Sequence, residues 1–241
     1  MRKIYLFTIA LAVLMSFTSC GKSKISQIIN DANLMIVNEE FDNALTLCDS
    51  LYENNLKKLS IEHKCDLSIL YRDIYNKTKS VDVLNNCIDV YKSALGDDAK
   101  RVRAYIVETH DEYVYEDFEY LMEKQTNIAI NKCLNKINGR LKKDTLDNLI
   151  NSCDSLYERR YSDMNFQQRL KLCSYYYDVA TKSEEGEIYD NAMEKSVIIY
   201  GDLVHNQDAV SEYMIGRYGF GGISVIYDLS LLYEGKKSGL I

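Results

Sequence analysis

The hexapeptide CDSLYE occurs twice in this 241-residue chain, at 48–53 and again at 153–158. A thiol, a carboxylate and a hydroxyl in consecutive positions are groups from which a nucleophilic site can be built. On a helix, however, Cys48, Leu51 and Tyr52 share one face, whereas the intervening aspartate and serine fall largely on the other side. The spacing therefore favours a packing contact, and no catalytic residue is predicted.

Acid–base and metal chemistry would depend on the three histidines, His63, His110 and His205. None of them lies in an HExxH motif or in a recognisable nucleophile elbow. The stretch ETHDEYVYEDFEY, which contains His110, offers several carboxylates to a metal or to acid–base work. We favour a helix with an acidic face whose Tyr113, Phe118 and Leu121 point toward the core. The chain is therefore not predicted to be an enzyme, and no metal site is expected.

The run SYYYD places three tyrosines in consecutive positions, which together span about 200° of a helix. They cannot all face one core, so we expect Tyr175 and Tyr176 to point inward and Tyr177 to face solvent. An exposed tyrosine on a helical scaffold is a candidate contact for a peptide or a sugar. Tyr177, Tyr115 and Tyr120 are the candidate partner contacts.

The elements that position these residues are predicted to be helices. The chain is 46% hydrophobic and 27% charged, has no proline and 11 glycines, and carries a net charge of −7. Helices joined by short turns suit a chain without proline, whereas an all-β protein would need more turn residues. The negative charge argues against non-specific binding of nucleic acid.

A much longer internal repeat surrounds the two hexapeptides. At an offset of 105 residues, DNALTLCDSLYE lies over DNLINSCDSLYE, with eight of twelve letters identical. The match extends without gaps over about 25–92, and it pairs Tyr71 with Tyr176 and Asn86 with Asn191. A spacing held over this length indicates an internal duplication.

The repeat also bears on the cysteines. Apart from Cys20 they are Cys48, Cys65, Cys87, Cys133, Cys153 and Cys173. Across the copies Cys65 corresponds to Leu170 and Cys87 to Ala192, so cysteine alternates with apolar residues. We favour buried free thiols and keep disulfides as the alternative, because the count is even. No CxxC motif or Cys/His pair has the spacing of metal ligands, and no cofactor is predicted.

Within each copy the apolar residues recur at helical spacing. In 41–52 they follow an i, i+3, i+4, i+7 stripe, and two more stripes follow at about 60–77 and 81–95. The short polar stretches NNLKK, NKTKS and LGDDAK mark the breaks. Helices with brief connections are expected to pack as antiparallel neighbours.

One of these hairpins resembles a tetratricopeptide (TPR) repeat. The run FDNAL (41–45) is similar to the opening of the second TPR helix, and NDANLMIVNEE is similar to the first, with Ala32 at the small crossing position. The usual Trp and Pro are missing, and Ala44 becomes Leu149 in the second copy. The resemblance implies an all-α, TPR-like α-solenoid of stacked antiparallel hairpins.

The first twenty residues are typical of a secretory signal. Arg2 and Lys3 precede an apolar run that ends near Phe17 and is shorter than the ~20 residues of a membrane-spanning helix. The sequence FTSC, ending at Cys20, resembles the lipobox of bacterial lipoproteins. That resemblance implies a diacylglyceryl group on Cys20 and further acylation, for instance with palmitate, which gives durable anchoring. A plain signal peptide followed by cysteine is the alternative.

The residues after Cys20, GKSKIS, contain no acidic side chain. In the Bacteroidota-type lipoproteins that this chain resembles, acidic residues at that place are associated with export to the cell surface. The resemblance therefore implies an outer-membrane anchor facing the periplasm, with the cell surface as the alternative location.

These observations predict the following organisation: a signal peptide at 1–19, a tether at 20–24, one TPR-like unit at 25–129, a second at 130–205, and a tail at 206–241 with a Gly-rich turn and a capping helix. The predicted function is a membrane-anchored scaffold that binds an envelope protein or peptide. An accessory glycan-binding lipoprotein with a SusD-like role is the alternative.

Overall fold

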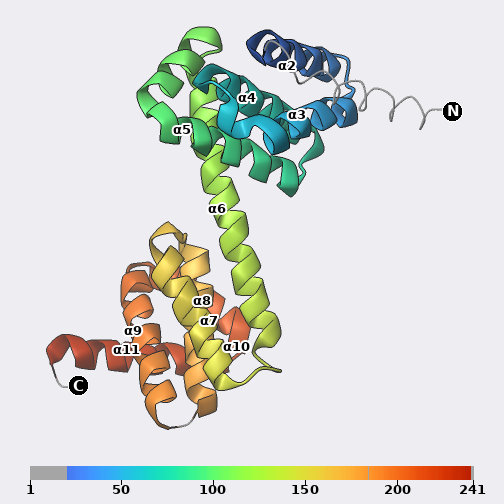
Figure 1. Ribbon diagram of the computed structural model, residues 1–241. Coiled ribbons are helices and arrows are strands. Elements are labelled where there is room, and N and C mark those ends of the chain that lie inside the picture. Colours follow the sequence, from blue (N-terminus) through green and yellow to red (C-terminus); the bar gives the residue numbers. More distant parts are fainter. Residues whose placement is uncertain (1–20, 184, 240–241) are drawn as a thin grey trace. The chain divides into compact units, whose positions relative to one another are not determined.

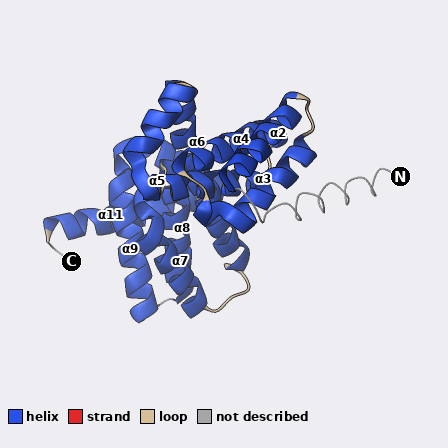
Figure 2. Cartoon of the chain, turned by 45° about the horizontal axis from the view of Figure 1, so that its top comes forward, coloured by secondary structure: helices blue, strands red, loops and turns tan. Residues whose placement is uncertain are grey.

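The computed structural model describes residues 21–183 and 185–239, and over these residues the chain is helical and contains no strand (Figures 1 and 2). The predicted all-α fold built from helical hairpins is thereby confirmed. The signal peptide, the lipobox and Cys20 lie outside the described residues. Within the described part of the chain, no helix combines the length and the apolar character that a membrane crossing requires.

The chain divides into two compact units, with the boundary between Gln125 and Thr126. The first unit contains α2 (Gly21–Val37), α3 (Phe41–Asn55), the 3-10 turn η1 (Leu56–Lys58), α4 (Ile61–Thr78), α5 (Val81–Thr109) and the first part of α6 (Glu112–Arg140). The second unit contains the rest of α6, α7 (Leu146–Arg160), the 3-10 turn η2 (Tyr161–Asp163), α8 (Phe166–Ser183), α9 (Glu187–Leu203), η3 (Val204–Asn206), α10 (Gln207–Tyr218) and α11 (Gly221–Ser238).

The order of helices repeats, as the duplicated sequence predicts. Helix α3, turn η1 and helix α4 recur as α7, η2 and α8, with every boundary displaced by 105 residues. The repetition continues beyond the region that aligns without gaps. Val102 and Ile106 are fully buried on the second half of α5, and Val210 and Met214 are buried with the same spacing on α10.

Local sequence explains where several of these helices begin. Ser60 caps α4 by accepting a hydrogen bond from the backbone N–H of His63, at 3.3 Å. At the equivalent place in the second unit, Asn165 accepts from the N–H of Gln168 at 3.0 Å and caps α8. Both caps satisfy an N–H group that has no partner inside its helix. The helix starts are therefore set by the same device in both copies, with a different residue type in each.

Helix α5 is interrupted within the polar stretch LGDDAK, where a break is predicted. Asp98 has extended backbone angles (φ −165°, ψ 99°), and its carboxylate accepts from the N–H of Arg101 at 3.1 Å. That contact is an N-cap for the helix segment that follows. Asp98 therefore ends the first segment of α5 and starts the second. The second half of α5 is thereby free to pack as a separate layer of the first unit.

Aromatic and aliphatic side chains fill the two cores. In the first unit Tyr91 on α5 stacks on Phe118 of α6, with ring centroids 4.3 Å apart and planes 9° apart, and both rings are buried. Phe118 and Leu121 point into this core as predicted. Tyr113 does not: it is 80% exposed, because a residue five positions before Phe118 lies about 140° away from it around the helix.

The Gly-rich stretch GRYGFGGIS forms the turn between α10 and α11. Gly219 adopts φ +61°, which glycine tolerates better than any other residue. Gly222 lies against the backbone of α10, where an added Cβ would approach the carbonyl oxygen of Met214 to 2.4 Å. These glycines let the last two helices cross closely.

Candidate functional site

The aspartate of the first CDSLYE hexapeptide joins three helices. Asp49 Oδ1 accepts a hydrogen bond from the Tyr71 hydroxyl of α4 at 2.7 Å and from the Asn86 amide of α5 at 3.2 Å. The Tyr71 ring is buried and meets Tyr52 edge-on, with the planes at 87°. Burial, and then the hydrogen bond to Asp49, raise the pKa of Tyr71 well above its ordinary value.

The second hexapeptide makes the same contacts. Asp154 accepts from the Tyr176 hydroxyl at 2.7 Å and from the Asn191 amide at 3.4 Å, and Tyr157 meets Tyr176 edge-on at 82°. All three polar partners are the same residue types in both copies. Such a network fixes the packing of three neighbouring helices in each unit. The hexapeptide is therefore structural, and it retained its aspartate because that side chain joins the helices.

The described cysteines are free thiols, and five of them are buried: Cys48, Cys65, Cys87, Cys153 and Cys173. The expectation that Cys48 and Cys153 occupy equivalent buried places is confirmed, since each is 0% exposed. Burial, and then the negative charge of Asp154, raise the pKa of the Cys153 thiol to about 12. A thiol with so high a pKa is a poor nucleophile at neutral pH, because the thiolate is the reactive form. Cys133 is the exception, because it is exposed on α6.

These thiols should respond very differently to iodoacetamide. In the native protein Cys133 should be alkylated rapidly and the five buried cysteines only after unfolding. Because raised pKa values keep buried thiols protonated, raising the pH from about 7 to about 9 should not expose them to reaction. Peptide mass spectrometry after a short labelling pulse measures this, with Cys133→Ser as the variant that should lack the fast reaction. Rapid native-state labelling of Cys153 would contradict the assignment.

The contact that most resembles a nucleophile with its base is the one between Ser26 and His63. Ser26 Oγ lies 3.0 Å from His63 Nε2, joining α2 to α4. The same positions in the second unit hold Asn131 and Gln168, whose amides are 3.4 Å apart. Both units thus keep a polar contact between equivalent helices, α2 with α4 in the first unit and α6 with α8 in the second. In the second unit the two amide side chains cannot act as nucleophile and base. The contact is therefore structural and holds two helices together.

His110, the histidine in the acidic stretch, faces Asp66 on α4. His110 Nε2 lies 3.9 Å from Asp66 Oδ1, and the same oxygen accepts from the Tyr105 hydroxyl at 2.9 Å. Burial raises the pKa of Asp66, and the hydrogen bond from Tyr105 partly opposes this. Among the described residues, no group of three or more His, Cys, Asp or Glu side chains is arranged to hold a metal ion.

The three candidate contact tyrosines lie in different surroundings. Tyr120 is 58% exposed on α6, and Tyr115 is partly buried with Arg103 5.3 Å above its ring. Tyr175 and Tyr176 point inward as predicted, but Tyr177 does not face solvent: it is only 9% exposed. The Tyr177 hydroxyl donates to Asp228 on α11 at 2.9 Å, and that helix lies beyond the part of the chain that aligns without gaps.

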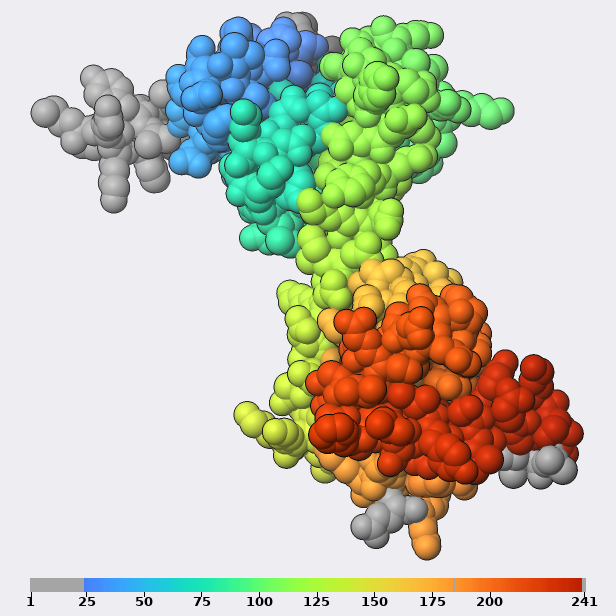
Figure 3. All heavy atoms as spheres, turned by 180° about the vertical axis from the view of Figure 1, so that it is seen from behind, coloured from blue at the N-terminus to red at the C-terminus, as the bar shows by residue number. Residues whose placement is uncertain are grey.

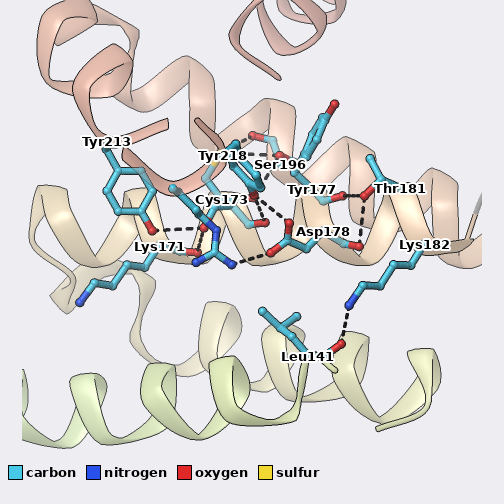
Figure 4. A network of polar contacts seen from close by, with 12 residues as sticks. Leu141, Lys171, Cys173, Tyr177, Asp178, Thr181, Lys182, Ser196, Tyr213 and Tyr218 are labelled. Carbon is cyan, nitrogen blue, oxygen red and sulfur yellow. Dashed lines mark hydrogen bonds and ion pairs between the residues drawn. The ribbon is translucent and has the colours of Figure 1, made fainter. Parts of the chain in front are cut away.

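Other tyrosines on this side of the second unit are engaged in an internal polar network (Figure 4). The Tyr218 hydroxyl donates to Asp178 Oδ1 at 2.9 Å, and Arg217 reaches Asp178 Oδ2 at 2.5 Å. Tyr213 lies 3.3 Å from the hydroxyl of Ser174. These contacts tie α10 to α8. Because the hydroxyls are used inside the unit, they give no specific support to a sugar site.

An unpaired apolar surface lies on the last helix. In the space-filling view the chain after α10, in red, lies on the surface of the second unit (Figure 3). Four large apolar side chains lie exposed on one side of α11 and its start; we call them the α11 apolar face: Phe220 (93% exposed), Ile223 (57%), Tyr227 (66%) and Leu231 (60%). The opposite side of α11 is buried through Gly222, Val225 and Leu229.

The corresponding helix of the first unit carries only part of such a face. Position 72 on α4 corresponds to position 177 on α8. Arg72 Nε lies 3.8 Å from Asp117 of α6, and in the second unit the Tyr177 hydroxyl donates to Asp228 of α11. Matching these two aspartates places Glu112 and Glu116 of α6 where α11 has Ile223 and Tyr227, and it places Tyr120, which is 58% exposed, where α11 has Leu231. The fold therefore does not require apolar residues at the positions of Ile223 and Tyr227. The apolar run ISVIYDLSLLY indicates a helix with apolar residues on every side. The sequence therefore does not reveal which side of that helix is covered.

No protein-family model matches the sequence, and comparison with curated proteins and with solved structures finds no similar protein.

Proposed function

We propose that the protein is a lipid-anchored, TPR-like helical scaffold of the bacterial envelope that binds a partner protein through the α11 apolar face. The observation that carries this proposal is the row of exposed apolar side chains on α11, of which Ile223 and Tyr227 stand where the equivalent helix carries glutamates. Contiguous exposed apolar surface of this kind is a feature of protein interaction sites.

The shape of the face favours a helical partner. Ile223, Tyr227 and Leu231 are spaced four residues apart, so they form a narrow row along α11 that matches the apolar stripe of another helix. Aromatic and aliphatic anchors of this size are the usual energetic centres of such contacts.

Charge argues for a protein over a lipid surface as the occupant of this face. Removal of residues 1–19 takes away Arg2 and Lys3 and changes the net charge from −7 to −9. A helix that lies in an anionic membrane surface usually carries basic residues around its polar side. On α11 the basic residues, Lys236 and Lys237, lie only in the last turn, and Lys236 pairs with Glu194 at 2.8 Å.

Site-specific photo-crosslinking in cells tests the proposal. A photoreactive phenylalanine analogue at Tyr227 should crosslink to a discrete envelope protein, whereas the same analogue at Tyr113, which is 80% exposed at the start of α6, should not.

The identified protein, once purified, should bind the scaffold directly. Ile223→Glu with Leu231→Glu should weaken that binding at least tenfold, because two buried charges would disrupt the apolar contact. Tyr113→Glu with Tyr120→Glu is the matched control, and Cys20→Ser should release the scaffold from the membrane fraction.

The other outcomes overturn the proposal. Crosslinks to phospholipid would make the face a membrane contact, and crosslinks between two copies of this chain would make it a self-association surface. Equal crosslinking at Tyr227 and Tyr113, or none at either position, would show that the α11 apolar face has no dedicated protein partner.

A further inference from the structure

A second feature of the second unit is a groove between α6 and α7. It has a volume of about 570 Å³. Its lining residues are Cys133, Lys136, Ile137, Arg140, Asn148, Asn151, Ser152, Ser155, Leu156, Arg159 and Arg160. The floor is apolar, because Ile137 and Leu156 belong to the core. We call this feature the basic groove, since four of its lining residues are lysine or arginine and none is aspartate or glutamate.

The positive charge of the basic groove is only partly neutralised from its rim. Arg140 pairs with Asp144 at 3.1 Å and Arg160 with Asp163 at 3.5 Å, and in both pairs the arginine is about half exposed. Exposed pairs of this kind are worth little and exchange readily for another anion. Among the described residues, no carboxylate lies within ion-pair distance of Lys136 or Arg159. A chain with a net charge of −7 thus concentrates uncompensated positive charge in one place.

The first unit has the same two helices without the charge. The residues that correspond to Lys136, Arg140, Arg159 and Arg160 are Asp31, Met35, Asn54 and Asn55. All four basic side chains are therefore absent from the other copy, and one position is acidic. Since both copies share the helix order and the Asp–Tyr–Asn network, packing does not account for the charge. The basic residues are a property of the second unit alone.

The chemistry of the lining points to a ligand with several anionic oxygens. Lysine and arginine supply charged N–H donors, and the side chains of Asn151 and Ser155 on α7 supply neutral ones. The Ser152 hydroxyl already donates to the Asn148 carbonyl oxygen at 2.7 Å, and the Asn148 amide donates to Asp144 at 3.1 Å. Donors of both kinds around a positively charged groove suit phosphate, whose oxygens accept several hydrogen bonds each. Along α7, Asn151 and Arg159 are about 12 Å apart at 1.5 Å per residue, so the groove offers donors to more than one phosphate group.

We infer that the basic groove binds a ligand bearing two or more phosphate groups. The α6 wall supplies Lys136 and Arg140, the α7 wall supplies Arg159 and Arg160, and Ser155 of α7 also lines the groove. Binding breaks no covalent bond, so the site captures its ligand without changing it. The site is independent of the α11 apolar face, which lies on a different helix.

Calorimetric titration of the full mature protein in detergent, at low ionic strength, tests this site. The probe is inorganic tripolyphosphate, which should bind once per chain and more tightly than orthophosphate. Lys136→Gln with Arg159→Gln should weaken tripolyphosphate binding at least tenfold, because two unpaired charges are lost. Lys136→Arg with Arg159→Lys should keep it within about threefold, because the charges stay. Bound tripolyphosphate should also slow iodoacetamide labelling of Cys133, which lines the groove.

A matched control separates the site from general electrostatics. Lys57→Gln with Lys58→Gln changes the net charge equally, on the exposed turn η1 of the first unit, and should leave the affinity unchanged within twofold. Equal weakening by both pairs of changes, or no binding of tripolyphosphate to the wild type, would overturn the inference. So would tighter binding of an oligoglutamate peptide, which would make the groove a site for acidic protein segments.

The source of the phosphate follows from a second titration. Bis(glycerophospho)glycerol carries the two phosphodiesters of a cardiolipin headgroup without its acyl chains. If it competes with tripolyphosphate for the groove, the inference holds with a lipid headgroup as the source. If only tripolyphosphate and other multiply charged phosphates bind, the inference holds with a free phosphate compound.

Discussion

Replacing Phe118 by alanine should lower the free energy of unfolding of the first unit by about 3–5 kcal/mol. The ring is fully buried and stacks on Tyr91 at 4.3 Å, so the change removes apolar area, leaves a cavity and ends an aromatic contact. Because the two rings come from α5 and α6, the loss falls on the contact that closes the first unit. Neighbouring side chains are close-packed and can fill only part of the space.

Urea unfolding followed by hydrogen exchange with mass spectrometry measures this effect. Amides of 41–109 should lose protection in Phe118→Ala, whereas those of 146–203 should keep theirs. Tyr120→Ala, on the same helix but 58% exposed, should change the free energy of unfolding by less than about 0.5 kcal/mol. A Phe118→Ala effect below about 1 kcal/mol would show that the stacked pair contributes little to the core.

Removing either hexapeptide aspartate should destabilise its own unit by about 2–3 kcal/mol. Asp49→Ala leaves the hydroxyl of the buried Tyr71 and the amide of Asn86 without their acceptor, and hydrogen bonds to charged groups contribute about 1.5–3 kcal/mol. Asp154→Ala should have a similar effect on the second unit, since its partners and distances are nearly the same.

The same chemical denaturation experiment measures the loss, and a double variant gives the reason for it. Asp49→Ala with Tyr71→Phe should recover part of the stability, because the orphaned hydroxyl is then absent. Ser50→Ala is the control within the hexapeptide and should be nearly neutral; nothing in the structure explains why this serine is kept in both copies. An aspartate effect no larger than that of Ser50→Ala would contradict a structural role for the network.

The sequence was sufficient to predict the helices and their repetition, because both depend on regular spacing. The apolar stripe that contains Ala44, Cys48 and Leu51 defines α3, and its recurrence 105 residues later defines α7. The Asp–Tyr–Asn networks were visible only as unexplained identities between the copies. Their members lie on three different helices, and nothing in local sequence says which polar residues meet.

The error at Tyr177 arises because the exposure of a residue depends on helices that lie far away in the chain. Helical spacing predicts that Tyr177 faces solvent, since three consecutive tyrosines cannot all face one core, yet α11 supplies Asp228 above it. The basic groove was missed because spacing within one helix does not give the register in which two neighbouring helices pack. Lys136 and Arg159 are ordinary surface residues on their own helices, and only the antiparallel pairing of α6 with α7 brings them to one groove.

The boundary between the units falls inside α6, and this has a consequence for how the protein folds. Here the last helix of one copy is the first helix of the next, so one nucleation event serves both. Folding of either unit thus leaves the other with a helix already begun, which makes the pair a minimal cooperative array.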